Sequence, residues 1–130
     1  MRLLIVEDEP FIATDLEMIV TGRGHQVVGV ADSLAEALAQ ASATEPQAAL
    51  VDINLIDGFT GVEIARRLTG QGVRVGFVTG NLDQIPPDFA GANGAVEKPF
   101  SDHSVELLLA VLDPDAPVPV ETAQLVRRPQ

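Results

Sequence analysis

Five side chains in this sequence are of types that together suit phosphoryl transfer. Asp52 is a carboxylate that can act as a nucleophile, while Thr79 and Lys98 can donate hydrogen bonds or neutralise charge. Glu7 and Asp8 add two more carboxylates. Acids that share one crevice raise one another's pKa, and a hard divalent cation such as Mg²⁺ removes that conflict. Each residue alone has an ordinary structural explanation, so a shared role requires that folding bring them together.

The positions of these residues along the chain predict such a meeting, because each follows a short apolar run that reads as a strand. The four runs are Leu3–Val6 before Glu7 and Asp8, Ala48–Val51 before Asp52, Val73–Val78 before Thr79, and Gly94–Val96 shortly before Lys98. Open α/β sheets place their ligands at the carboxyl ends of parallel strands. We therefore expect one site at one edge of a sheet.

Helical patterns separate the predicted strands, and most of them carry recognisable start signals. Pro10 suits the first position of a helix, and Ser33 with Glu36 forms a capping-box pattern before an Ala-rich helix. A third helix is predicted over Gly61–Leu68. Ser101 caps a last helix, whose predicted inner stripe is Val105, Leu108, Leu109 and Leu112.

The segment after Thr79 breaks this pattern. Leu82–Ala90 should hold a fourth helix, but Pro86 and Pro87 lie in its middle. A proline inside a helix removes a hydrogen-bond donor and clashes with the preceding turn, which costs about 3 kcal/mol. We expect a short, displaced or disordered helix here.

A second strand over Gln26–Val30 completes a β-α pattern repeated five times, which predicts a flavodoxin-like α/β fold. This is a doubly wound parallel sheet of (βα)5 type with strand order 2-1-3-4-5. That order places the first and third strands side by side. The domain is expected to span residues 1–112, and the Pro-rich residues 113–130 to form an extended or disordered tail.

Bulk composition narrows the classes of function. The 130 residues suit one domain, and a net charge of −11 argues against nucleic acid as a partner. There are no cysteines, so neither disulfides nor thiolate chemistry can operate. The sequence has no apolar run of roughly 18 residues that would span a membrane, and no charged region before a signal-type core. We expect a cytoplasmic protein.

Taken together, the motifs resemble those of a response-regulator receiver domain of two-component signalling. The likeness covers Arg2–Leu112 and is carried by four motifs: Val6-Glu7-Asp8-Glu9, Leu50-Val51-Asp52, Val78-Thr79-Gly80 and Glu97-Lys98-Pro99-Phe100. The resemblance implies a phosphorelay module that accepts a phosphoryl group from a histidine kinase or a histidine phosphotransfer protein and then switches partner binding. It implies weak self-catalysed phosphorylation and dephosphorylation, not a turnover enzyme.

The resemblance also assigns roles to individual residues. Asp52 is the implied phosphoacceptor, Thr79 the switch hydroxyl, and Lys98 the partner of the acyl phosphate. Asp8 and Asp52 are implied to bind Mg²⁺ directly, together with the main-chain carbonyl of Asn54, while Glu7 acts largely through water. The implied docking residues for the phosphoryl donor are Phe11, Ile12, Pro99 and Phe100.

Two positions depart from the usual receiver pattern. Ile56 stands where receivers usually have a proline, and Ala95 stands where they usually have an aromatic residue. The segment Phe77-Val78-Thr79-Gly80 is similar to the Phe-Ala-Thr-Gly motif of an atypical receiver group. Members of that group are often single-domain proteins paired with kinases of the HWE type.

Two other classes of function stay open on sequence grounds. One is a phosphatase or phosphotransferase of related fold with Asp52 as nucleophile. Such enzymes usually carry a second acid two residues after the nucleophile, where this chain has Asn54. The other is a receiver-like scaffold that binds partners without phosphate, whose signature would be the loss of a site residue.

Overall fold

The computed structural model describes residues 1–117 and 125–129. Its strands are β1 (Arg2–Val6), β2 (Gln26–Ala31), β3 (Ala48–Val51), β4 (Arg74–Thr79), β5 (Gly94–Glu97) and β6 (Val126–Arg127). Its α-helices are α1 (Pro10–Gly22), α2 (Leu34–Thr44), α3 (Gly61–Gly70) and α4 (Asp102–Leu112), with two 3₁₀ turns, η1 (Leu82–Gln84) and η2 (Phe89–Gly91).

The strands form one sheet in the order β2-β1-β3-β4-β5-β6. The first five are parallel, and β6 pairs antiparallel with β5 at the edge. The flavodoxin-like class and the predicted order of the five parallel strands are confirmed. The sixth strand was not predicted.

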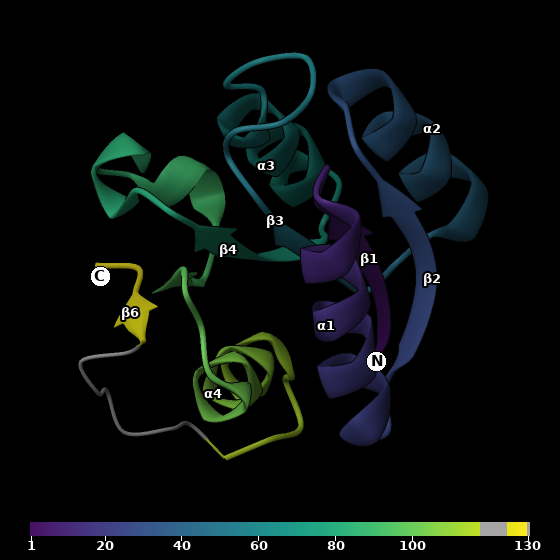
Figure 1. Cartoon of the computed structure of the whole chain (residues 1–130), viewed down its shortest axis with the longest axis vertical. Helices are drawn as coiled ribbons and strands as arrows, with labels where there is room; N and C mark the ends of the chain where they lie inside the picture. Colours follow the sequence, from purple (N-terminus) through teal and green to yellow (C-terminus); the bar gives the residue numbers. More distant parts are fainter. Residues whose placement is uncertain (118–124, 130) are drawn as a thin grey trace.

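Helices cover both faces of this sheet, as in a doubly wound fold. In Figure 1, α1 and α4 lie on one face, and α2 and α3 lie on the other. The two apolar cores follow this division, since α1 and α4 share one buried cluster while α2, α3 and η2 contribute to the second. Within the described residues, no helix has the length and apolar character to cross a membrane.

The predicted helix starts agree with the structure. Pro10 is the first residue of α1, and the side chain of Ser33 accepts the Glu36 N–H at the start of α2. Ser101 caps α4 by accepting the Ser104 N–H, and the Ser104 hydroxyl oxygen accepts the Ser101 N–H in return. The four residues predicted for the inner stripe of α4 are all buried.

The segment after β4 contains no α-helix but two short 3₁₀ turns, which agrees with the expectation of a short helix. The second turn is fastened to α3 by a two-pronged ion pair between Arg66 and Asp88 and by the Thr69 hydroxyl, which donates to the Ala90 carbonyl. Phe89 and Ala90 both have positive φ, at 55° and 51°. Residues other than glycine rarely adopt this conformation, so packing on α3 must hold them there.

The described end of the tail is extended and packs against the domain. Val126 and Arg127 pair with Ala95 and Gly94 of β5, and Leu125 is only 2% exposed. The Pro-rich composition predicts an extended or disordered tail, and the burial of Leu125 and the pairing with β5 are additions to that prediction. Residues 118–124 and 130, which belong to the same predicted tail, lie outside the described residues.

Candidate functional site

The carboxyl ends of β1 and β3 lie side by side, because these two strands are neighbours in the sheet. Val6 pairs with Val51, and the Asp52 N–H donates to the Val6 carbonyl at 2.9 Å. Asp52 therefore extends β3 by one residue beside the start of the acidic run Glu7–Glu9. This is the juxtaposition that the predicted strand order required.

Asp52 is a buried carboxylate, 6% exposed, with a different partner for each oxygen. Oδ1 accepts the N–H of Ile53 at 2.7 Å, and Oδ2 accepts from the Lys98 ammonium at 2.8 Å. These bonds fix the orientation of the carboxylate, and the ammonium lies on one oxygen only. Such a group is positioned to act as a nucleophile next to a source of positive charge.

Lys98 bridges two acids from different strands. Its Nζ donates to Glu7 Oε1 at 2.6 Å and to Asp52 Oδ2 at 2.8 Å. Burial acts to lower the pKa of the Lys98 ammonium, but the hydrogen bonds to Asp52 and Glu7 outweigh it and raise that pKa above its ordinary value. Lys98 therefore stays protonated and supplies a permanent charge at the site.

Glu7 is an acid with almost no exposure to water, so burial disfavours its charged form. Burial raises its pKa from 4.5 to about 6, against the lowering effect of the Lys98 ammonium and of the Glu9 N–H. The charge of Asp52 raises it slightly further. Two buried carboxylates sharing one lysine leave the site with excess negative charge, which a metal cation would neutralise.

The donor set of this acidic site fits a hard cation. Glu7, Asp8 and Asp52 each offer a carboxylate oxygen, and these oxygens lie within 4.8 Å of one another. Glu7 and Asp52 are buried, whereas Asp8 is exposed and opens the site to water. Mg²⁺ prefers one or two carboxylates with several waters or phosphate oxygens, which this half-open arrangement allows.

Thr79 lies at the end of β4, fully buried, on the other side of β3 from β1. Its Oγ1 accepts the N–H of Asn81 at 3.2 Å, and its carbonyl accepts the N–H of Lys98 at 2.8 Å. The second bond ties the end of β4 to the residue that follows β5. The hydroxyl hydrogen is available for a further acceptor, because the Asn81 bond uses only the oxygen lone pair.

Two residues contribute to the site without having been predicted. Gly61 opens α3 against the end of β3, where an added Cβ would lie 2.1 Å from the Asp52 carbonyl oxygen. Gln84 in η1 accepts from the Asn54 side chain at 2.9 Å. A glycine at a helix start was visible in the sequence, but its partner was not. A contact between residues 30 positions apart leaves no local pattern.

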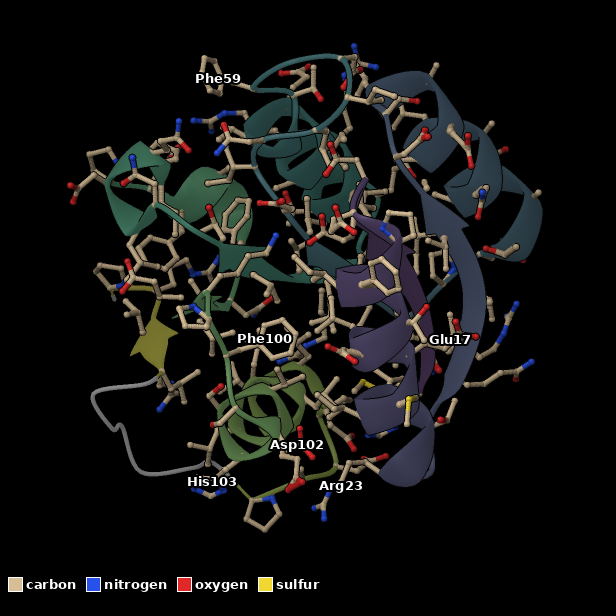
Figure 2. The ribbon with its side chains drawn as sticks, in the orientation of Figure 1. Glu17, Arg23, Phe59, Phe100, Asp102 and His103 are labelled. Atoms are coloured by element: carbon tan, nitrogen blue, oxygen red, sulfur yellow. The ribbon has the colours of Figure 1, made fainter. Side chains whose placement is uncertain are left out.

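Three of the four predicted docking residues lie together, and the fourth adjoins them in the sequence of α1. Ile12, Pro99 and Phe100 line a shallow groove together with Asp15 and Lys98. Phe11 is 83% exposed one residue before Ile12 on α1. Figure 2 shows Phe100 between α1 and α4. The groove reaches the site directly, since Lys98 belongs to both.

The two positions that depart from the receiver pattern lie in different surroundings. Ile56 is 71% exposed in the loop after β3, and Phe59 in the same loop projects away from the body (Figure 2). Ala95 is fully buried in the sheet, beside Phe77 of β4. Val126 of β6 packs against the apolar cluster that contains Ala95. The tail therefore brings an apolar side chain to the side of the sheet where the usual ring is absent.

Comparison with known proteins assigns the chain and its fold to a family. The family model described as the response regulator receiver domain matches residues 3–111. The chain belongs to this family, whose members are signalling domains of two-component systems. Receiver domains bind Mg²⁺ at an acidic pocket, and the family implies a histidine kinase as phosphoryl donor.

Within the family, the chain is similar to regulators of the PhyR type. It is 48% identical over 68 residues to the phyllosphere-induced regulator PhyR of Methylorubrum extorquens, which covers 52% of this chain and 26% of that one. The anti-anti-sigma factor PhyR from Bartonella quintana, known from a crystal structure, is 32% identical in sequence, with a TM-score of 0.75. The match covers 85% of this chain and 46% of that one. The chain thus spans less than half of these PhyR proteins.

A shorter protein matches over nearly its whole length. The solution structure of SdrG from Sphingomonas melonis Fr1 is 34% identical, with a TM-score of 0.75. The match covers 86% of this chain and 95% of SdrG.

Proposed function

We propose that the chain is a receiver that accepts a phosphoryl group on Asp52 and changes its binding to a partner protein as a result. The observation that carries the proposal is the environment of Asp52. It is a buried carboxylate at a strand end, with the Lys98 ammonium on one oxygen and the carboxylates of Glu7 and Asp8 beside it.

In the proposed reaction, an oxygen of Asp52 attacks the phosphorus atom of a phosphohistidine. The new P–O bond forms as the P–N bond breaks, and the histidine nitrogen of the donor leaves with the electron pair. Lys98 neutralises charge on the transferred group, and the Thr79 hydroxyl donates to one of its oxygens. Mg²⁺ held by Asp8, Asp52 and the Asn54 main-chain carbonyl, with Glu7 acting through water, would neutralise the other oxygens.

The proposed donor is a histidine kinase, of the HWE type, or a histidine phosphotransfer protein, docked on the groove formed by Ile12, Pro99 and Phe100 with Phe11 beside it. An exposed phenylalanine next to an apolar groove suits a protein partner. A kinase of this class draws the phosphoryl group from ATP, so the proposed compartment is the cytoplasm. The description of the Bartonella quintana PhyR as an anti-anti-sigma factor supports an output through protein binding.

Two features favour a receiver over the alternatives. The residue two positions after Asp52 is Asn54, and its side chain is bound to Gln84, so the second acid of the related phosphatases is absent at that position. None of the five residues that the receiver motifs assign to the site is lost, which supports a receiver over a phosphate-independent scaffold.

The test is incubation with acetyl phosphate, with and without Mg²⁺, followed by intact mass measurement and a phosphate assay. A receiver gains one phosphoryl group per chain, only with Mg²⁺, and loses it slowly. Continuous release of phosphate over many turnovers from unrelated phosphomonoesters would instead indicate a phosphatase. Absence of labelling, with the fold intact, would indicate a phosphate-independent scaffold.

A further inference from the structure

The outer edge of β5 is covered by a segment of the same chain. β6 pairs antiparallel with β5 through Gly94–Arg127 and Ala95–Val126, and the Arg128 N–H donates to the Asn93 carbonyl at 3.1 Å. Gly94 fits this approach, because an added Cβ would lie 2.9 Å from the Val126 carbonyl oxygen. Without β6, the edge would offer unpaired backbone groups to a partner strand.

This cover is fastened by two side chains on opposite faces of the sheet. Leu125 is buried in the cluster shared with Val96 and α4, while Val126 packs against the cluster of Ala95 on the other face. β6 nevertheless has only two residues, so its backbone pairing is short. A short strand held by two apolar side chains is of the kind that one altered contact can release.

β6 and the segments that follow Thr79 and Lys98 line one pocket together. Val126 lines this pocket together with Leu82, Glu97, Pro99 and Phe100. Leu82 begins η1, three residues after Thr79, and Pro99 follows Lys98 directly. In Figure 1, β6 lies at the edge of the sheet beyond β5. A shift of Thr79 or Lys98 would therefore move residues that line the same pocket as Val126.

Phosphorylation would change the contacts of both residues. The Lys98 ammonium now bridges Glu7 and Asp52, and a phosphoryl group on Asp52 gives it new oxygens to contact. The Thr79 hydroxyl gains an acceptor that it lacks among the bonds described above. Leu82 and Pro99 would then shift relative to Val126 along the walls of the pocket that they share.

We propose that β6 is a displaceable cover of the β5 edge, released when Asp52 is phosphorylated, and that the uncovered edge takes an extended strand of a partner protein. The proposal rests on the proposed function, since it needs phosphorylation at Asp52. Strand addition to a free edge is an established mode of protein recognition, and β6 itself shows that this edge accepts an antiparallel strand.

Thermodynamic linkage gives a sharp test. If phosphorylation releases β6, then release of β6 must raise the affinity for a phosphoryl mimic by the same factor, and a variant that weakens β6 gains up to that factor. Beryllofluoride, which mimics the phosphoryl group on a carboxylate, serves as the probe with Mg²⁺. Val126→Asp puts a charge into the pocket and weakens the cover, while Val126→Thr keeps the branched shape and serves as the matched control.

We expect full-length Val126→Asp to bind beryllofluoride roughly fivefold more tightly than the parent, with Val126→Thr unchanged, in titration calorimetry. In the unaltered chain, saturation with beryllofluoride should move the methyl NMR signals of Leu125 and Val126 toward those of an unstructured peptide. It should also speed exchange of the Arg128 amide.

Binding of beryllofluoride with unchanged signals from Leu125 and Val126 would overturn this inference and leave the proposed function standing. Equal affinity in Val126→Asp and the parent would do the same. Failure of every variant and of the parent to bind beryllofluoride would overturn the proposed function, and this inference with it.

Discussion

At the scale of single residues, the site carries more negative than positive charge, and Lys98 neutralises only part of the excess. One ammonium is shared between Glu7 and Asp52, and the exposed Asp8 adds a third carboxylate. Burial raises the pKa of Glu7, the most deeply buried of these acids, and the charge of Asp52 adds to the rise. A metal cation or a transferred phosphoryl group would each alter this balance.

The raised pKa of Glu7 predicts a pH dependence of folding. Its pKa is about 6 in the folded chain against an ordinary value of 4.5, so the folded state holds this proton more tightly. The stability that this proton contributes is fully present below pH 4.5 and is lost as the pH rises through about 6.

We therefore expect metal-free parent protein to lose about 1–2 kcal/mol more unfolding free energy than Glu7→Gln between acidic and neutral pH. Urea unfolding in a chelator at the two pH values measures this. Glu17→Gln, on the outer side of α1, is the control and should behave like the parent. An identical pH dependence in Glu7→Gln and the parent would show that Glu7 titrates normally.

The competition between Lys98 and a metal for the same carboxylates predicts opposite effects on Mg²⁺ affinity. Asp8→Asn removes a charged oxygen and should weaken Mg²⁺ binding roughly tenfold. Lys98→Gln removes a positive charge that contacts Glu7 and Asp52, and should strengthen it. Titration calorimetry with Mg²⁺ measures both, with Glu17→Gln as the control. Changes of the same sign in both variants would contradict the arrangement.

At the scale of elements, the segment between β4 and β5 consists of two turns with different attachments. η1 follows Thr79 closely and is joined to the loop after Asp52 by the Asn54–Gln84 hydrogen bond. η2 is fastened to α3 through Arg66–Asp88 and Thr69. η1 is therefore the part that a change at Asp52 reaches first.

Hydrogen exchange can separate the two turns. On addition of Mg²⁺ and beryllofluoride, we expect amide protection to change over residues 82–85 and to stay constant over residues 89–92. The reason is that only η1 shares contacts with the site, while the strained backbone of Phe89 and Ala90 is held by α3. Equal responses in both turns would mean that the segment moves as one unit.

Much of this arrangement was predictable because the sequence carries local signals for it. The apolar runs predicted where the strands end, and Ser33 and Ser101 predicted where two helices begin. Pro86 and Pro87 argued against a regular helix between β4 and β5. The residues that hold the irregular parts were not predictable. Asn54–Gln84 and Arg66–Asp88 join positions 30 and 22 residues apart, and such pairs have no signature in a single sequence.

At the scale of the whole molecule, the tail is the main difference from the expected fold. A Pro-rich composition predicted an extended or disordered tail, and the structure adds that Leu125 is buried and that β6 extends the sheet. Two apolar residues are too few to predict a strand from their pattern. Their burial depends on an edge, at β5, that becomes apparent only once the sheet is assembled.

Burial of Leu125 predicts that the tail contributes to stability. Leu125→Ala should lower the free energy of unfolding by about 2–3 kcal/mol, because it empties a site in the core beside α4. Met18→Ala is the control, since Met18 is a large apolar residue that is exposed on α1. Urea unfolding measures both. A loss no larger in Leu125→Ala than in Met18→Ala would show that the tail packs only loosely.

The central claim, that Asp52 accepts the phosphoryl group, is tested most directly by locating that group. The parent, Asp52→Asn and the control Asp57→Asn are incubated with acetyl phosphate and Mg²⁺ and mapped by tandem mass spectrometry. Asp57 is the matched control because it lies in the loop after β3, where it accepts from Thr60 and from the Leu34 N–H. We predict one phosphoryl group on Asp52 in the parent and in Asp57→Asn, and none in Asp52→Asn, whose amide cannot attack phosphorus. Labelling of Asp52→Asn at the parental rate and position would contradict the account.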